Sequence, residues 1–136
     1  MPDGHVVSFR FDITEVVQAA EAAQATFVAA LAVADLLDVF VSPALVSIKW
    51  PNDVLLDGVK VSGILVESGS HANGDLWLAV GIGVNLAHAP DNTERGATAV
   101  AERLRADLAF APPIEAAAEI LAETFAVWWG RWQTLG

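Results

Sequence analysis

The dipeptide Asp57-Gly58 constrains the fold of this chain more than any other feature, because it lies between the strand-like runs VLL and VKVSGILVE. Asp-Gly flanked by alternating apolar residues is a strong signal for a β-hairpin with a two-residue turn. Such a turn fixes which residues of the two strands face each other. The predicted pairs are Leu56 with Val59, Leu55 with Lys60, Val54 with Val61, and Asp53 with Ser62.

The other segments carry strand or helix patterns. Strand patterns occupy residues 5–12, 45–50 and 74–86. Helix patterns occupy residues 16–40 and 113–132. Residues 88–98 are polar and are expected to form an exposed loop. The apolar stripe of the first helix comprises Ala23, Phe27, Ala30, Leu31, Ala34 and Leu37, and that of the second Ile114, Ala117, Ala118, Leu121, Phe125, Trp128 and Trp132. These elements predict one α+β domain, in which a mixed, largely antiparallel sheet is flanked by helices.

Charge and composition exclude several classes of protein. The chain has 17 acidic and 7 basic residues and a net charge of -10, which disfavours non-specific binding to nucleic acid or to an anionic membrane. It has no cysteine, so disulfides and thiolate metal sites are excluded. The N-terminus has no leader-like pattern, and no apolar run approaches ~20 residues. The sequence therefore predicts a soluble, cytoplasmic protein in which an anionic ligand needs a local cationic site.

Both lysines of the chain, Lys49 and Lys60, lie close together in the sequence. In the predicted register Asp53 is diagonal to Lys60 on one sheet face, a separation of about 7–8 Å that a substrate can occupy. Gly63 leaves open backbone beside this pair, where a ligand ring can approach. From geometry alone an ordinary surface salt bridge, worth at most about 1 kcal/mol, is the favoured explanation. The later Gly81-Ile82-Gly83 run is likewise compatible with a bulge or a bend, and it does not fit a dinucleotide-binding fingerprint.

Four motifs, in this order and spacing, closely resemble the catalytic domain of biotin protein ligases. They are Lys49-Trp50-Pro51-Asn52-Asp53, Lys60, Gly63-Ile64-Leu65-Val66-Glu67, and Gly81-Ile82-Gly83-Val84-Asn85-Leu86. The resemblance runs from about residue 5 to the C-terminus. It implies the catalytic fold that biotin ligases share with class II aminoacyl-tRNA synthetases.

The resemblance also implies an activity. Such enzymes join biotin to ATP with Mg²⁺, release pyrophosphate, and pass the biotinyl group from biotinyl-5'-AMP to a lysine of a biotin carboxyl carrier protein. Lys60 then corresponds to the catalytic lysine that holds the biotin carboxylate and the α-phosphate, and Asp53 to the group that orients or deprotonates the carrier lysine. By the same match, the residues that bind the adenylate are Asn85, Asn52 and Lys49. Those that bind biotin are Lys60, Gly63, Ile64 and Leu65. The resemblance implies no metal-ligating residue.

Two features of the family are not found in residues 1–136. One is an upstream segment with a Gly-Arg-Gly-Arg-type loop over biotin, and the other is a small C-terminal β domain. We therefore expect a partial catalytic domain. Two alternatives remain open: a fragment that binds a carrier domain or a partner through a strand edge without catalysis, and a lipoate-type ligase or acyltransferase. A homodimer is a further possible assembly.

Overall fold

The computed structural model describes residues 6–13, 21–50, 52–70, 72, 76–87 and 96–135. Within these ranges the strands are β1 (Val6–Ile13), β2 (Val46–Lys49), β3 (Asp53–Leu56), β4 (Val59–Ser70) and β5 (Leu76–Asn85). The helices are α1 (Glu21–Asp38) and α2 (Ile114–Leu135), with short 3₁₀ turns η1 (Pro43–Leu45) and η2 (Val100–Glu102). The predicted elements are therefore present, although the beginning of the predicted first helix and most of the predicted loop 88–98 lie outside the described residues.

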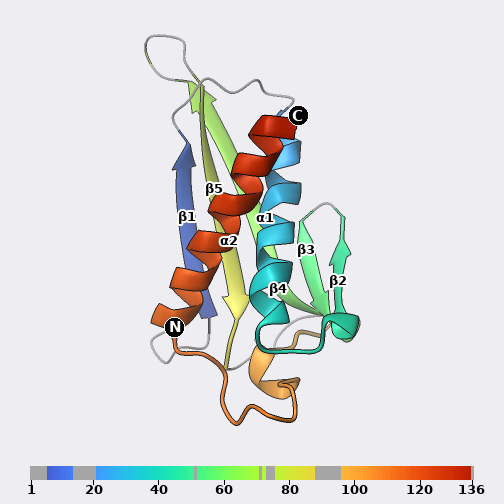
Figure 1. The fold of residues 1–136 in the computed structure, drawn as a ribbon. Helices are drawn as coiled ribbons and strands as arrows, with labels where there is room; N and C mark the ends of the chain where they lie inside the picture. Colours follow the sequence, from blue (N-terminus) through green and yellow to red (C-terminus); the bar gives the residue numbers. More distant parts are fainter. Residues whose placement is uncertain are drawn as a thin grey trace.

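The described strands form one antiparallel sheet in the order β1-β5-β4-β3-β2. Both helices cover the same face of this sheet, α1 across its middle and α2 beside it (Figure 1). The α+β prediction is confirmed, with a purely antiparallel sheet among the described strands. The opposite face of the sheet carries neither α1 nor α2, and this leaves it available for a ligand.

The predicted hairpin forms at Asp57 and Gly58, which have φ values of 54° and 79°. Positive φ at both central residues matches the twist that a two-residue hairpin turn requires. The first two predicted pairs are confirmed, but the register then shifts between Leu55 and Val54. Beyond the shift the observed pairs are Val54 with Ser62 and Asp53 with Gly63, so the last two predicted pairs are wrong.

The physical reason for the shift lies in β4. Val61 is 0% exposed and Ser62 is 2% exposed, so two consecutive residues are buried where regular alternation would expose one of them. A bulge accommodates such a pair, because two residues of one strand then oppose a single residue of its partner. The bulge therefore moves every later residue of β4 by one position relative to β3.

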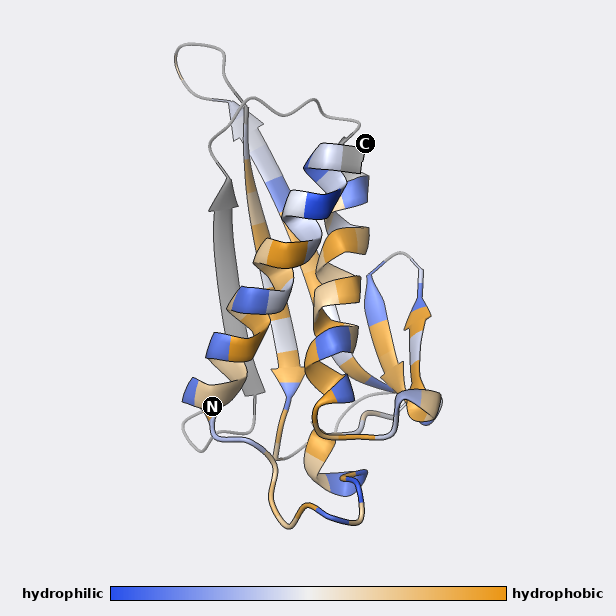
Figure 2. Cartoon of the chain, viewed as in Figure 1, coloured by the Kyte–Doolittle hydropathy of each residue, from blue (hydrophilic) through white to orange (hydrophobic). Residues whose placement is uncertain are grey.

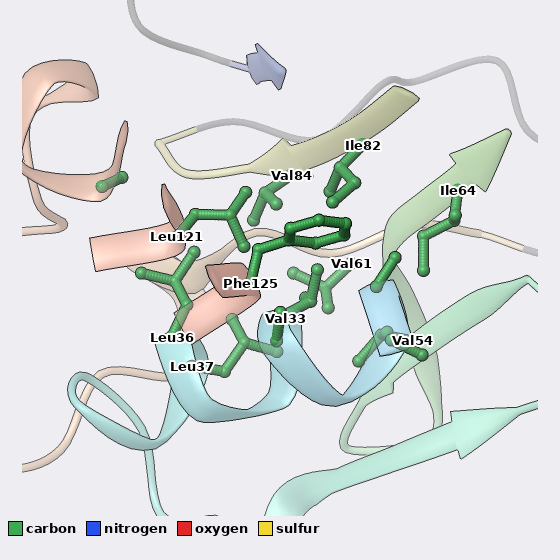
Figure 3. Packing of buried hydrophobic residues seen from close by; sticks show 14 of the residues in the cluster. Val33, Leu36, Leu37, Val54, Val61, Ile64, Ile82, Val84, Leu121 and Phe125 are labelled. Carbon is green, nitrogen blue, oxygen red and sulfur yellow. The ribbon is translucent and has the colours of Figure 1, made fainter. Parts of the chain in front are cut away.

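The hydrophobic core lies between the helices and the sheet. Figure 3 shows Phe125 of α2 among side chains of α1, including Val33 and Leu36, and of the strands, including Ile82 and Val84. In Figure 2 apolar residues run along most of α1, whereas polar residues mark exposed turns of α2. Neither helix is long and apolar enough to cross a lipid bilayer, as judged over the described residues.

The predicted stripe of α2 is confirmed in its centre, since Ala117, Leu121 and Phe125 are buried. The predicted stripe of α1 is confirmed at Ala30 and Leu37, which are buried, and is wrong at Phe27, which is 43% exposed. The buried face of α1 also includes Ala25, Val28, Ala29, Ala32, Val33 and Leu36. Helix α1 is apolar on most sides, so periodicity alone does not select the side that faces the sheet.

Side-chain hydrogen bonds join the two helices to each other, among them one from the Trp132 indole to Gln24 Oε1 at 2.8 Å. The Thr124 hydroxyl donates to the carbonyl oxygen of Ala32 at 2.9 Å, and the Trp128 indole donates to Asp35 Oδ2 at 2.6 Å. Near the end of α1, partial desolvation and the neighbouring Asp35 carboxylate raise the pKa of Asp38, although the Asp38 side chain is largely exposed. The end of α1 is therefore a region of unfavourable negative charge.

Candidate active site

A row of register-paired residues crosses four strands on the open face of the sheet. Lys49 of β2 faces Asp53 of β3, Asp53 faces Gly63 of β4, and Gly63 faces Gly83 of β5. Directly opposed residues in antiparallel strands share a face of the sheet. The row therefore places a cation and a carboxylate next to two positions that have no side chain.

Leu65 and Gly81 form the next pair on the same face of these two strands. With glycine at positions 63, 81 and 83, the open face is hollowed over β4 and β5. The hollow has a volume of about 440 Å³, and it is lined by Asn52, Asp53, Lys60, Gly63, Ile64, Leu65, Gly81, Ile82 and Gly83. This volume lies in the range of small-ligand sites, which is ≈ 300–1,000 Å³.

The side chain of Lys60 extends over this glycine-lined backbone. Lys60 Nζ is 3.3 Å from Asp53 Oδ1, and a Cβ built on Gly63 would lie 3.2 Å from the same Nζ. The Lys60 side chain is 51% exposed and that of Asp53 27% exposed, so the pair adds at most about 1 kcal/mol to stability. Its more consequential effect is positional, because the ammonium is held above the part of the hollow where a ligand can contact backbone.

Backbone and side-chain hydrogen bonds hold the strands around the hollow. The Ile64 N–H donates to the carbonyl oxygen of Asn52 at 2.9 Å. The buried Ser62 hydroxyl donates to the carbonyl oxygen of Gly83 at 2.7 Å, which joins β4 to β5. Ser62 was not predicted as a site residue. The sequence feature that could have indicated it is its position between Lys60 and Gly63 in the same strand.

Asn85 is tied to a segment that sequence analysis did not select. Its Nδ2 donates to the carbonyl oxygen of Thr98 at 3.0 Å, and the Thr98 N–H donates to the carbonyl oxygen of Lys60 at 2.8 Å. Thr98 is 4% exposed, so the prediction of an exposed loop is wrong at this residue. The burial arises because Thr98 lies against the edge of β4 at Lys60, a contact between residues 38 positions apart that local patterns do not indicate.

Six of the predicted site residues line the hollow. They are Asn52, Asp53, Lys60, Gly63, Ile64 and Leu65. The other two, Lys49 and Asn85, lie outside its lining, although Lys49 faces Asp53 and Asn85 follows Gly83 by two residues on β5. The structure thus brings the predicted residues together at the hollow, with the Ile64 side chain buried on the helix-covered face, while their chemical roles stay predictions.

The site offers little to bind a metal ion on its own. Over the described residues, no group of three or more His, Asp or Glu side chains is placed to hold one. Asp53 is the carboxylate that lines the hollow, and it is already paired with Lys60. Mg²⁺ is commonly bound through one or two carboxylates together with substrate phosphates. The residues present therefore fit a magnesium ion that arrives with a nucleotide better than a resident one.

An antiparallel sheet with helices on one face and a lysine-bearing, glycine-lined hollow on the other corresponds to a known protein class. The model of the Biotin/lipoate A/B protein ligase family matches residues 4–85, which is more than half of the chain. The chain belongs to this family. The resemblance to biotin protein ligases that the motifs indicate is thereby confirmed at the level of the family.

Curated relatives are named as biotin ligases. The biotin–[acetyl-CoA-carboxylase] ligase of Paracoccus denitrificans is 48% identical over 118 residues, which cover 85% of this chain and 49% of that protein. The enzyme of the same name from Mycobacterium tuberculosis is 38% identical over 60 residues, covering 44% of this chain and 21% of that protein. The chain thus spans at most about half the length of these relatives.

Solved structures share the fold. A biotin protein ligase from Aquifex aeolicus superimposes with a TM-score of 0.72 at 22% identity, over 96% of this chain and 55% of that one. The biotin protein ligase of Leishmania major in complex with biotinyl-5-AMP gives a TM-score of 0.66 at 22% identity, over 89% of this chain and 53% of that one. These similarities confirm the predicted biotin-ligase fold.

Proposed function

We propose that this chain takes part in the ATP-dependent activation of biotin and in the transfer of biotin to a carrier protein. The observation that carries this proposal is the Lys60 ammonium, which is held 3.3 Å from Asp53 above the backbone of Gly63. A 48% identical relative named as a biotin–[acetyl-CoA-carboxylase] ligase supports the choice of biotin.

In the first half-reaction, a biotin carboxylate oxygen attacks the α-phosphorus of ATP. A new O–P bond forms, the bond from the α-phosphorus to the bridging oxygen breaks, and pyrophosphate leaves. Both reactants are anions, and the chain has a net charge of -10, so a fixed local cation is needed where they meet. A unit charge ~4 Å from Lys60 Nζ would gain about 4 kcal/mol at an effective dielectric constant of ~20. This attraction is strongest where charge develops in the transition state.

In the second half-reaction, the amine of a carrier lysine attacks the carbonyl carbon of biotinyl-5'-AMP. An amide bond forms, the bond from the carbonyl carbon to the phosphate oxygen breaks, and AMP leaves. A lysine amine is mostly protonated near neutral pH, so a carboxylate is needed to orient it and accept its proton. Asp53 is the carboxylate that lines the hollow, and we assign this task to it.

The remaining predicted residues are proposed to bind rather than to react. Gly63, Ile64 and Leu65 present strand backbone and an exposed side chain to biotin. Asn52 lines the hollow, whereas Asn85 and Lys49 lie beside it on the adjacent strands and are assigned to the adenylate. Magnesium would neutralise the nucleotide phosphates when bound with ATP.

Binding to the chain itself is the first test. We expect biotinyl-5'-AMP titrated into ¹⁵N-labelled protein to shift the backbone signals of Gly63, Leu65 and Gly83, while lipoyl-5'-AMP at the same concentration shifts them less. Larger shifts with the lipoyl compound would favour a lipoate-type enzyme. No shift with either compound, together with binding of a carrier domain, would favour a non-catalytic fragment.

Turnover is the second test, and it uses a chimera. The matched 118 residues of this chain replace their counterparts in the Paracoccus denitrificans relative. We expect the chimera to release pyrophosphate in a biotin-dependent manner and to biotinylate a carrier domain. A chimera that unfolds cooperatively, like the parent enzyme, but releases no biotin-dependent pyrophosphate would contradict the proposal.

A further inference from the structure

Thr98 uses each of its polar groups to contact a different part of the molecule. Its N–H donates to the carbonyl oxygen of Lys60 at 2.8 Å, and its carbonyl oxygen accepts from Asn85 Nδ2 at 3.0 Å. Its hydroxyl donates to Glu102 Oε2 at 2.9 Å. One buried residue thus joins the catalytic-lysine candidate of β4 to the adenylate-binding candidate of β5.

The bond to Lys60 lies where the sheet is least regular. The β3–β4 register shifts just after the pair of Leu55 with Lys60, and the described β4–β5 pairing starts at Ser62 with Val84. Lys60 therefore precedes the β5 ladder, and its carbonyl oxygen is bonded by Thr98 instead. This bond restrains the backbone from which the ammonium reaches Asp53.

The bond to Asn85 fixes the orientation of a carboxamide. A backbone carbonyl oxygen accepts hydrogen bonds and does not donate them, so the amide nitrogen of Asn85 must be the atom that points to Thr98. One N–H and the amide oxygen are then left for other partners. A donor and an acceptor side by side form the pair with which an asparagine recognises the N6/N7 edge of adenine.

Glu102 in turn fixes Thr98. Its Oε2 accepts two hydrogen bonds, from the Thr98 hydroxyl and from the Ala99 N–H, each at 2.9 Å. Hydrogen bonds to a carboxylate are stronger than bonds between neutral groups. The turn that carries Glu102 is itself attached to the sheet, because the Ala101 N–H donates to the carbonyl oxygen of Leu86 at 2.8 Å. The Thr98–Ala99 peptide is therefore held from both sides.

We infer that Thr98 and Glu102 are positioning residues that set the carboxamide of Asn85 and the backbone of Lys60 for binding the adenylate. Thr98 acts through its hydrogen bonds to Asn85 and Lys60, and Glu102 acts through Thr98. The inference rests on the proposed function for the identity of the ligand. The positioning relation itself is testable without any ligand.

The ligand-free test uses NMR spectra of the ¹⁵N-labelled 136-residue chain. Thr98→Val removes the hydroxyl at nearly constant shape, Thr98→Ser keeps it, and Glu102→Ala removes the carboxylate. We expect Thr98→Val and Glu102→Ala to shift the side-chain amide signals of Asn85 and to speed hydrogen exchange of the Thr98 N–H. Thr98→Ser should restore the wild-type signals. Glu119→Ala, on the exposed side of α2, is the control for loss of a carboxylate and should leave them unchanged.

Titration of biotinyl-5'-AMP and of biotin into the same samples tests the consequence for binding. Misplacing one hydrogen bond worth ~1.4 kcal/mol weakens binding about tenfold. We expect about this loss for biotinyl-5'-AMP in Glu102→Ala and Thr98→Val, and a smaller loss for biotin, because Lys60 serves both ligands whereas Asn85 is assigned to the adenylate alone. A general loss of structure would weaken both ligands together, and Thr98→Ser would not reverse it.

The outcomes of the two tests separate the positioning role from the proposed function. Unchanged Asn85 signals in Glu102→Ala would overturn the positioning role, and Glu102 is exposed enough for this variant to fold even if Thr98→Val does not. Shifted Asn85 signals in a chain whose wild type binds no biotinyl-5'-AMP would instead overturn the proposed function and leave the positioning relation standing. Equal loss of affinity for biotin and for biotinyl-5'-AMP would overturn the assignment to the adenylate.

Discussion

Lys60 and Asp53 form an ion pair of 3.3 Å although neither is the strand partner of the other. Lys60 faces Leu55, and Asp53 faces Gly63. Asp53 and Lys60 are diagonal neighbours across β3 and β4, and the bulge between their pairs places Gly63 opposite Asp53 where the regular register would place Ser62. A residue without a side chain therefore lies beneath the ion pair, and this leaves room for the lysine and for a ligand.

Removing the charge of Lys60 should have a larger effect than removing that of Lys49. We expect Lys60→Met, in the chimera, to reduce biotin-dependent pyrophosphate release by about 10²- to 10³-fold, since a preorganised group at the developing charge is lost. Lys49→Met removes the same charge outside the hollow and should reduce the rate less. Biotin binding should weaken much less than the rate in Lys60→Met. Equal losses in the two variants would show that net charge, and not position, is responsible.

Asp53→Asn should act mainly on the second half-reaction. When biotinyl-5'-AMP is supplied to the chimera, we expect transfer to a carrier domain to slow by about 10²- to 10⁴-fold, the range for loss of a general base. Asp57→Asn is the control, because Asp57 pairs with Arg103 at 3.2 Å outside the hollow and asparagine suits the hairpin turn. Transfer at the parent rate in Asp53→Asn would make this aspartate structural only.

Gly63→Ala should disturb the ion pair, whereas Gly81→Ala should not. A Cβ at position 63 would lie 3.2 Å from Lys60 Nζ, so the flexible end of the lysine must move away from Asp53. A Cβ at position 81 meets the carbonyl oxygen of Leu65 at 3.5 Å, an ordinary contact. We expect a changed Lys60 Nζ signal in NMR spectra of Gly63→Ala alone. Similar signals in both variants would contradict this description of the site.

Gly130→Ala and Gly58→Ala should change stability in opposite directions. A Cβ meets nothing within 4 Å at either position, so the difference lies in the backbone. Gly130 lies inside α2, where alanine is favoured by roughly 0.5–1 kcal/mol. Gly58 has a φ of 79°, where a side chain costs roughly 1–2 kcal/mol. Chemical denaturation should show a higher free energy of unfolding for Gly130→Ala and a lower one for Gly58→Ala.

Asp38→Asn should stabilise the protein at neutral pH but not in acid. The pKa of Asp38 is raised in the folded state, so the folded chain binds a proton more readily than the unfolded chain does. The ionised carboxylate therefore destabilises the fold, fully so above the raised pKa, and this effect disappears as the pH falls below the ordinary value of 3.8. The position at the C-terminal end of α1 suggests a gain of about 0.3–1 kcal/mol at pH 7.

The matching measurement for Asp38→Asn is denaturant unfolding at pH 7 and near pH 3. We expect the difference from wild type to shrink at the lower pH. Glu119→Gln on α2 serves as a control for loss of one carboxylate from this acidic chain. A gain that persists unchanged in acid would mean that the charge of Asp38 is not its cause.

Much of the fold was predictable from local sequence patterns. The turn at Asp57 and Gly58 was predictable because two residues with positive φ need a short, specific sequence. The bulge was not, because it depends on the burial of Val61 and Ser62 under the helices. The sheet-facing side of α1 was not predictable either, since its apolar residues surround most of the helix and α2 helps to determine which side is covered.

The site residues also fall into those that local sequence predicts and those that it does not. Lys60, Asp53 and Gly63 lie within eleven positions of one another and occur in motifs, so the hairpin brought them together in the prediction. Thr98 and Glu102 were missed because their partners are distant in sequence. The weak signal was a glutamate three residues after Ala99, the spacing of a capping box, but alanine has no side-chain oxygen with which to complete that pattern.

The two faces of β4 and β5 have separate consequences for the evolution of this chain. The side chains of Ile64, Ile82 and Val84 are buried under the helices, while Gly63, Leu65 and Gly81 lie on the face that carries the hollow. On the proposed function, substitutions on the face that carries the hollow can alter which small acid is accepted without repacking the core. A family that includes ligases for both biotin and lipoate can therefore diversify at alternate positions of two strands while the scaffold beneath them persists.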